Sequence, residues 1–382
     1  MLPLVVLLYG SLLFLVYYVI QYYKNVARYP KGPMPLPIVG NFFQLRSKLL
    51  HEDIPVLAKK FGNVFTIYVP IPIVVLSDYE SVKEAFVTKG DEFAGRPQLN
   101  VKDEFQFCAF QIKLSVQEFL RCLENIKDKS AVDMRWPLQL ITNTSSSLIR
   151  FAAIKFPFLK YLPGFKYYIV DRQRPHIFTI QNFIRKNVAN ALKSYSKDIE
   201  SDCFVHAYTQ KIGSSEYLND DQLLATCSDF FLAGQETTTT TLRWGVLLLA
   251  TNQDVQDKLR EEILSVIGSS RLPAMVDKPQ MPYTTATVLE LQRRANILQM
   301  NVLHKTLVDT EVADAMERTI PFSIGKRQCA GEGMARVELF IGLAALVQHY
   351  RIEPADGIPI DLTPETGVIM LPKQQKVRLV PV

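Results

Sequence analysis

The chain opens with an almost wholly apolar stretch. Residues 1–23 contain no charged side chain and include the run LPLVVLLYGSLLFLVYYVI. A helix needs about 20 apolar residues to cross a bilayer, so this pattern predicts a transmembrane anchor over residues 1–23. Tyrosines gather at its far end, where phenolic rings favour the headgroup region. Lys24, Arg28 and Lys31 follow directly, and positive charge on that side predicts that the rest of the chain stays in the cytosol.

A cleaved signal peptide is the alternative interpretation of this stretch. Such a peptide would begin with basic residues, have a shorter apolar core and end at a small-residue cleavage site. None of these three features is visible in the sequence, which therefore favours a retained anchor.

Four prolines follow the anchor, at positions 30, 33, 35 and 37 within YPKGPMPLPIVGN. Because proline fixes φ, closely spaced prolines favour an extended and stiff spacer. Residues 24–41 are therefore predicted to be a rigid strap between the anchor and a globular body over residues 42–382. An ordinary proline-rich surface loop would have the same composition.

The pattern after the strap predicts short β-strands near both ends of the body and helices between them. FTIYV and IVVL are rich in β-branched residues, which favour strands. Ser77 and Glu80 have the spacing of a capping box, which predicts a helix start there. Helical spacing then dominates to about residue 310, and the tail GVIMLPKQQKVRLVPV has a hairpin-like pattern. The predicted fold class is mainly α with small β-sheets (α+β).

A long helix is predicted from residue 220 to residue 251. Asn219, followed three residues later by Gln222, is typical of a helix start. Nothing interrupts the pattern except Gly234 and Gly245, so a continuous helix would be roughly 48 Å long at about 1.5 Å per residue.

Five consecutive threonines, residues 237–241, lie in the middle of this helix. Threonine is a poor helix former, and the run costs about 2–3 kcal/mol relative to alanine. One interpretation is a buried helix whose hydroxyls bond back to the carbonyls of the preceding turn. The other is a helix that passes over a reaction centre, where Gly234 admits a ligand, Thr237 offers a hydroxyl and Glu236 an acid. The stretch alone favours the first interpretation.

Two further patterns carry candidate chemistry. Glu290 and Arg293 stand three apart on a predicted helix and share a face, as many solvated pairs do. The segment PFSIGKRQCAGEGMARVELF, residues 321–340, places one thiol, Cys329, among glycines directly before an apolar helical pattern. That pattern predicts a helix leading into the core. A buried structural role is the usual one for a free cysteine.

Composition narrows the classes of function. With 382 residues, 48% of them hydrophobic, the chain can bury a sizeable core. The net charge is +5, but no dense Lys/Arg run is interleaved with aromatics, which argues against a nucleic-acid-binding protein. The five cysteines include no close pair. Their number and spacing argue against a disulfide framework and a cysteine-rich zinc site and favour a reducing compartment.

Three motifs follow one another along the chain, and their order adds to what each indicates alone: AGQETT at 233–238, Glu-x-x-Arg at 290–293 and FSIGKRQCAG at 322–331. Together they resemble the cytochrome P-450 family of haem-thiolate monooxygenases, specifically its membrane-anchored microsomal type of animals. The anchor, the strap and FAGRP at 93–97 are similar too. The family pattern Phe-x-x-Gly-x-Arg-x-Cys-x-Gly is matched at every fixed position, by Phe322, Gly325, Arg327, Cys329 and Gly331.

The resemblance implies the cytochrome P-450 fold and a haem whose iron is ligated by the Cys329 thiolate. A thiolate axial ligand gives the iron electron density that favours cleavage of the O–O bond. Gly325 permits a tight turn that aims backbone amides at the sulfur. By resemblance, Arg327 pairs with a haem propionate and Phe322 shields the sulfur. Gly331 gives clearance below the porphyrin, and the dipole of the following helix would stabilise the thiolate.

The resemblance also gives roles to the other motifs. The long helix would cross the oxygen-binding face of the haem, with Gly234 nearby, Thr237 at the oxygen and Glu236 in the proton-delivery path. Hydroxyls that interrupt the backbone ladder would leave room for oxygen and water. Glu290 and Arg293 would form a buried structural pair behind the haem loop.

The partners implied are O2, a lipophilic substrate such as a fatty acid, sterol or foreign chemical, and an NADPH-dependent flavoprotein reductase. The expected location is the endoplasmic reticulum membrane. The reductase is expected to dock near Lys326 and Arg327, because a basic face suits an acidic flavodoxin-like partner. Lys326 can equally be a solvated loop charge.

The chain departs from the family by its length. The family carries Trp-x-x-x-Arg on an early helix, where both residues reach a propionate. Here Trp136 is followed four residues later by Leu140, and Trp244 by Leu248.

A second shortened place lies between the Glu-x-x-Arg motif and the cysteine. The family has strands, a short helix and a meander there, including an arginine that completes the Glu-Arg pair, and Arg318 is the candidate substitute in this chain. These departures predict an internally shortened P-450 fold. The alternative function is therefore a non-catalytic shortened membrane-anchored relative, from a splice form or a faulty gene model, with weak or no haem binding.

Overall fold

The computed structural model describes most of the chain outside residues 96–173. The described residues are 2–45, 50–69, 71–95, 132–133, 174–197, 201, 203–215, 218–299, 301–302, 304–310, 321–365 and 369–382. The chain divides into two compact units, Met1–Pro97 with Met300–Gln328, and Gln98–Gln299 with Cys329–Val382. The predicted anchor and strap thus share a unit with the first part of the predicted body, and the cysteine motif is divided between Gln328 and Cys329.

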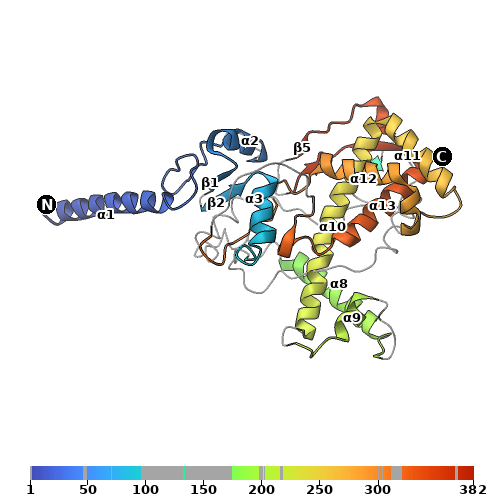
Figure 1. Ribbon diagram of the computed structural model, residues 1–382, viewed down its shortest axis with the longest axis horizontal. Coiled ribbons are helices and arrows are strands. Elements are labelled where there is room, and N and C mark those ends of the chain that lie inside the picture. Colours follow the sequence, from blue (N-terminus) through green and yellow to red (C-terminus); the bar gives the residue numbers. More distant parts are fainter. Residues whose placement is uncertain are drawn as a thin grey trace. The chain divides into compact units, whose positions relative to one another are not determined.

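The first unit begins with helix α1, Leu2–Val26, where the sequence predicts an anchor (Figure 1). Within the described part of the chain, however, no helix is long and apolar enough to cross a membrane. The described residues therefore do not meet the prediction of a transmembrane helix.

The hairpin of the first unit agrees with the sequence. Strands β1, Val64–Tyr68, and β2, Pro72–Leu76, pair antiparallel. Alternate side chains of β1, Phe65 and Ile67, are fully buried. They pack against apolar side chains of helix α2, Leu50–Phe61. One face of the strand, made of alternate residues, thus packs on one face of the helix.

Helix α3, Tyr79–Lys83, begins one residue later than predicted. Its cap is Asp78, whose carboxylate accepts a hydrogen bond from the backbone N–H of Ser81 at 3.0 Å. The predicted cap, Ser77, donates instead to the carbonyl of Asn63 at 3.0 Å. Both residue types are good caps, and the bond to Asn63 leaves Asp78 to cap the helix. The chain then continues into the π-helix η1, Glu84–Thr88.

The second unit is built around helix α10, Asp220–Thr251, whose bounds are those predicted. The side chain of Asn219 caps it by accepting from the backbone N–H of Gln222 at 2.9 Å. Helices α8 and α9 contact the first half of α10, and α11, α12 and α13 contact its second half (Figure 1). Their bounds are α8 Arg174–Leu192, α9 Phe204–Thr209, α11 Gln253–Val266, α12 Pro282–Ala295 and α13 Glu332–His349, with 3-10 turns η4 Met275–Gln280 and η6 Ala355–Gly357.

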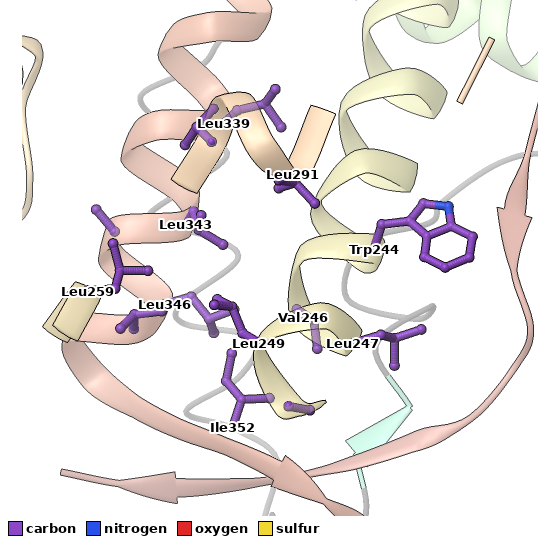
Figure 2. Close-up of a cluster of buried hydrophobic side chains, with 14 of the residues drawn as sticks. Trp244, Val246, Leu247, Leu249, Leu259, Leu291, Leu339, Leu343, Leu346 and Ile352 are labelled. Atoms are coloured by element: carbon purple, nitrogen blue, oxygen red, sulfur yellow. The ribbon is translucent and has the colours of Figure 1, made fainter. Parts of the chain in front are cut away.

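The core of the second unit lies among α10 to α13. Figure 2 shows leucines from all four helices meeting there, including Leu249, Leu259, Leu291 and Leu343. Trp244 is buried beside them and donates its indole N–H to the carbonyl of Met370 at 2.9 Å. This tryptophan is therefore part of the core packing.

Short antiparallel sheets complete the described parts of the second unit. Strand β7, Lys376–Pro381, pairs with β4, Tyr350–Pro354, and with β3, Val132–Asp133. Strand β5, Pro364–Glu365, pairs with β6, Leu371–Pro372. The predicted hairpin within the tail is wrong, because β6 and β7 lie in different sheets. Val377 and Leu379 of β7 are buried in the core, and this burial sets β4 as the partner. The mainly helical structure with small sheets confirms the predicted fold class.

Candidate active site

Cys329 lies directly before the start of helix α13 in the second unit. Its thiol is free and exposed. The helix cap is Gly331, which provides no side-chain hydrogen bond to the first turn. A methyl group on Gly331 would meet the Cys329 sulfur at 3.9 Å, and one on Gly333 would meet nothing within 4 Å. The sulfur therefore lies close to Gly331 at the start of α13, where no side chain caps the first turn.

The other described thiols are less suited to bind a ligand. Cys227 is buried, and burial, with a smaller contribution from nearby Cys203, raises the pKa of its thiol to about 11. Cys203 is partly buried in the same hydrophobic cluster. Cys108 and Cys122 lie outside the described residues. The exposed Cys329 is the described thiol that an external group can reach.

The residues before the cysteine form a tight turn in the first unit. Gly325 begins the 3-10 turn η5, Gly325–Arg327, with φ +78°. A methyl group on Gly325 would overlap the carbonyl oxygen of Phe86 in η1. The predicted need for glycine therefore has two physical causes, the left-handed backbone and the close approach of η1. Phe322 is partly buried at the start of this turn.

Both basic residues of the turn have protein partners. Lys326 forms an ion pair with Asp91. The Nε of Arg327 donates to the carbonyl of Ala94 at 2.7 Å, and its side chain is exposed. Asp91 offsets the charge of Lys326, so the basic face expected for a reductase is weaker than the sequence alone implies.

The threonine run of α10 bonds along its own helix. The Thr237 hydroxyl donates to the carbonyl of Ala233 at 2.6 Å, and the Thr241 hydroxyl donates to the carbonyl of Thr237 at 2.9 Å. The Thr240 hydroxyl lies 3.5 Å from a Glu236 carboxylate oxygen. These bonds support the back-bonding interpretation. The expectation that the hydroxyls interrupt the backbone ladder is wrong, because α10 runs through the segment without a break.

The same stretch of α10 still has features of a ligand-binding face. A methyl group on Gly234 would meet nothing within 4 Å. Among the described side chains, Gln235 Oε1 is buried with no hydrogen-bond partner, and Thr238 Oγ1 is buried with only the Glu338 carboxyl nearby. Buried polar atoms without partners are uncommon and often mark functional positions. The open space at Gly234 and the unpartnered Gln235 oxygen are the two features of this stretch that fit a bound ligand.

Sequence reasoning missed Glu338, which lies on α13 beside this stretch. Burial raises the pKa of its carboxyl above the ordinary value, and the nearby Thr238 hydroxyl partly opposes that rise. The available signal was a single carboxylate within the apolar run VELFIGLAALV. An acid at such a position is costly unless it has a role or a partner.

Helices α10 and α13 run in the same direction where they touch. A methyl group on Gly342 would lie 3.6 Å from Leu242. Glu338 and Thr238 each precede these residues by four positions, which is about one helical turn. The Glu338 carboxyl therefore lies beside Thr238, the residue that follows Thr237.

Glu290 and Arg293 pair as predicted, but on the surface. Two hydrogen bonds of 2.7 Å join them, and both side chains are about half-exposed. Arg294 is a third partner at 3.1 Å from Glu290. Hydrogen bonds from Arg293, and then from Arg294, lower the pKa of Glu290 to about 2. The predicted burial is wrong because α12 presents this turn to solvent, and Arg318 lies outside the described residues.

A cavity of about 520 Å³ lies at η4 and the exposed side of α12. Its lining contains none of the predicted site residues; it is formed by Met275, Lys278, Pro279, Pro282, Thr285, Ala286 and Leu289. Among the described residues, no cluster of three metal-binding side chains is found. The cysteine motif and α10 therefore remain the candidate site.

Comparison with known proteins identifies the family. The cytochrome P450 family model matches residues 30–119, 108–316 and 316–379, which is nearly the whole chain. The chain belongs to the cytochrome P450 family. Cytochrome P450 2H1 of Gallus gallus is 27% identical, with 92% of this chain and 93% of the relative covered. Cytochrome P450 2C2 of Oryctolagus cuniculus is 29% identical, with 92% and 94% covered, and cytochrome P450 2C44 of Mus musculus is 30% identical, with 94% of each covered.

This cytochrome P450 is shorter than its relatives. The alignment with the Gallus gallus protein spans 466 positions, whereas this chain has 382 residues. The difference lies inside the alignment, as the departures in the sequence predict.

Members of the cytochrome P450 family bind haem through a cysteine thiolate. The residues of this chain fit that group. Cys329 offers an exposed sulfur at a helix start that no side chain caps, and α10 offers open space at Gly234 with the buried, unpartnered Gln235 Oε1 beside it. A thiolate near a helix N-terminus is stabilised by the helix dipole.

Proposed function

We propose that this chain is a haem-thiolate monooxygenase of the endoplasmic reticulum membrane that inserts one atom of O2 into a lipophilic substrate. The observation that carries the proposal is the free, exposed Cys329 at the uncapped start of α13, within a segment that matches the family model. The chemistry that thiolate-ligated haem would supply is the activation of O2, one atom of which would enter the substrate while the other leaves as water.

The cysteine motif would hold the haem through residues on both sides of the sulfur. Cys329 would hold the haem iron through its thiolate, and the backbone N–H groups at the start of α13 would moderate the charge on that sulfur. Arg327 would pair with a propionate, since its guanidinium is exposed and suits a carboxylate. Gly331 would give clearance below the ring, and Phe322 would shield the sulfur from water.

Residues of α10 would hold and supply protons beside the oxygen-binding site. Thr237 would hold a proton at its hydroxyl, which the Ala233 carbonyl orients. Glu236 would supply protons along the helix. Glu338 of α13 is a partly buried acid beside Thr238, and its raised pKa would let it hold a proton next to the threonine run.

Electrons would come from an NADPH-dependent flavoprotein reductase that docks near Lys326 and Arg327. The exposed positions of both residues support this. Asp91 pairs with Lys326, so we expect the steering by charge to be modest and to weaken further with salt.

Incorporation of labelled oxygen tests the proposal. The full chain, expressed in membranes and loaded with haem, is supplied with the reductase, NADPH, 18O2 and a panel of fatty acids, sterols and alkoxycoumarins. We expect one 18O atom in at least one product, and none with Cys329→Ser. If the wild-type chain labels no product, the proposal is wrong, and if it also fails to bind haem, the alternative of a non-catalytic shortened relative replaces it.

A further inference from the structure

The cavity at η4 and α12 is lined by none of the residues assigned to the haem. Its volume of about 520 Å³ is within the range of about 300–1,000 Å³ that small-molecule sites have. Apolar side chains form most of its wall, among them Met275, Ala286 and Leu289. Leu289 is 49% exposed, whereas Leu291 of the same helix is buried in the core (Figure 2). Helix α12 thus has an apolar face at the cavity that is separate from its core face.

One lysine is the charged side chain of this wall. Lys278 is partly buried in η4, among the apolar residues that line the cavity. No ion pair within the described part of the chain includes it. The other polar side chain of the wall, Thr285, already donates its hydroxyl to the Met281 carbonyl at 2.9 Å. The cavity therefore combines an apolar wall with one positive charge, and a partly desolvated charge gains more from an opposite charge than a fully hydrated one does.

The carboxylates that fix η4 and the start of α12 have partners of their own. Asp277 accepts two hydrogen bonds from the Arg271 guanidinium, at 2.8 and 2.7 Å. Glu262 of α11 accepts from two backbone N–H groups in the first turn of α12, at 2.8 and 2.7 Å. Neither carboxylate pairs with Lys278, so the charge of this lysine is available to an anion that enters the cavity.

The same hydrogen bonds hold both walls of the cavity in place. Besides its bonds to Arg271, Asp277 accepts from the backbone N–H of Ala274 at 2.9 Å, which fixes the start of η4. Pro279 and Pro282 restrict φ where the chain passes from η4 into α12. Walls that are fixed before binding lose little conformational entropy when a ligand enters.

We propose that this cavity binds a small lipophilic anion, which has an apolar chain or ring and one carboxylate. The apolar part would cover Leu289, Ala286 and Met275, and the carboxylate would pair with Lys278. Burial of the apolar part favours binding, and the ion pair selects the anion over a neutral molecule of the same shape. The site is independent of the haem and of the proposed monooxygenase reaction.

Chemical footprinting of lysines tests the site in the full chain. The protein in lipid nanodiscs is briefly acetylated with an amine-reactive reagent at increasing concentrations of 4-phenylbutyrate, and mass spectrometry measures the acetylation of each lysine. We expect acetylation of Lys278 to fall by roughly threefold or more at saturation, because a paired carboxylate favours the unreactive ammonium form. Lys258, an exposed lysine of α11 that does not line the cavity, should react unchanged.

Two matched variants test the apolar wall. Leu289→Gln removes an apolar side chain from the cavity, and Leu264→Gln changes a leucine of α11 that is 40% exposed and does not line the cavity. Because both leucines are partly exposed, neither change should unfold the protein. The phenylbutyrate concentration that half-protects Lys278 should rise roughly fivefold or more in Leu289→Gln, since less apolar surface is buried. It should not change in Leu264→Gln.

The neutral analogue 4-phenylbutanol tests the role of charge, and it should protect Lys278 more weakly than the anion does. Equal protection by the two compounds would show that the cavity does not recognise an anion. If phenylbutyrate protects Lys278 and Lys258 alike, or protects neither, or half-protects Lys278 at the same concentration in Leu289→Gln as in the wild type, the proposed site is wrong. No step of this test uses haem or turnover, so its failure would leave the proposed function standing, and failure of the oxygen-labelling experiment would leave this site standing.

Discussion

At the scale of single residues, the role proposed for Thr237 has to be reconciled with the hydrogen bond that its hydroxyl makes within α10. Its bond to the Ala233 carbonyl accounts for its place in α10 without any cofactor. The same bond fixes the orientation of the hydroxyl, whose oxygen can still accept a hydrogen bond. The two interpretations of the threonine run are therefore compatible, and only a measurement of chemistry separates them.

Replacement of Thr237 distinguishes a structural role of the threonine run from a chemical one. Thr237→Ala should leave haem binding intact and divert electrons from product to peroxide, because the proton-holding hydroxyl is lost. Thr237→Ser, which keeps the hydroxyl, should restore most of the coupling. The measurement is the ratio of product to NADPH consumed, together with peroxide. Equal ratios in all three proteins would show that the run is only structural.

Glu338 predicts a dependence of stability on pH. Because burial raises its pKa in the folded state, the native protein holds this proton at pH values where the unfolded chain has lost it. The contribution of Glu338 to the free energy of unfolding is therefore fully present below the unfolded pKa of about 4.5. It is lost as pH rises through the folded pKa.

Glu338→Gln checks this expectation, since glutamine cannot ionise. The variant should match the wild type in acid and be more stable than the wild type at neutral pH, as measured by urea unfolding across the pH range. A constant difference at every pH would mean that ionisation of Glu338 is not involved.

At the scale of elements, the sequence predicts best where local signals and burial agree. Helix α10 has its predicted bounds because the Asn219 cap and the apolar spacing specify the same start. The cap of α3 was misplaced by one residue, because Ser77 has a tertiary partner, Asn63, that local spacing does not reveal. Strand β7 of the tail pairs with β4, which is distant in sequence, and local spacing does not reveal that partner either.

The turn η5 allows a test with a matched control. Gly325 and Gly268 have nearly the same φ, +78° and +75°. A methyl group on Gly268 would meet nothing within 4 Å, whereas one on Gly325 would overlap the Phe86 carbonyl. Gly268→Ala should therefore cost only the left-handed strain, about 1–2 kcal/mol. Gly325→Ala should cost a further ~1–3 kcal/mol from the overlap. Equal losses in urea unfolding would contradict the close packing of η1 on η5.

The exposed ion pair of α12 gives a second prediction at this scale. A pair on the surface is worth about 0.2–1 kcal/mol, whereas breaking a buried pair costs ~3–5 kcal/mol. Arg293→Ala and Arg294→Ala should therefore each destabilise the fold by less than about 1 kcal/mol at neutral pH. A loss of several kcal/mol would show that the pair is buried.

The pH dependence of this pair has the opposite sign to that of Glu338. The two arginines hold the Glu290 pKa at about 2 in the folded state, below the ordinary value of 4.5. Its contribution is present above pH 4.5 and is lost as pH falls towards 2. The difference between wild type and Glu290→Gln should shrink over that window, and high salt should shrink it at all pH values.

At the scale of the whole molecule, the sequence was most informative where chemistry constrains residue type. The cysteine motif and the threonine helix predicted the family that the comparison shows. The sequence could not predict the exposure of Glu290 or the surroundings of Glu338, because both depend on which elements cover α12 and α13. A shortened chain can change that covering without changing any motif.

The central claim is that Cys329 ligates haem in this shortened chain. The most direct measurement is the absorbance spectrum of the reduced, carbon monoxide-bound protein, purified from membranes after haem loading. We predict the red-shifted band of a thiolate-ligated haem in the wild type, and its absence in Cys329→Ser, with Cys203→Ser as a control that retains the band. A band that survives in Cys329→Ser, or one that never forms in the wild type, would contradict the account.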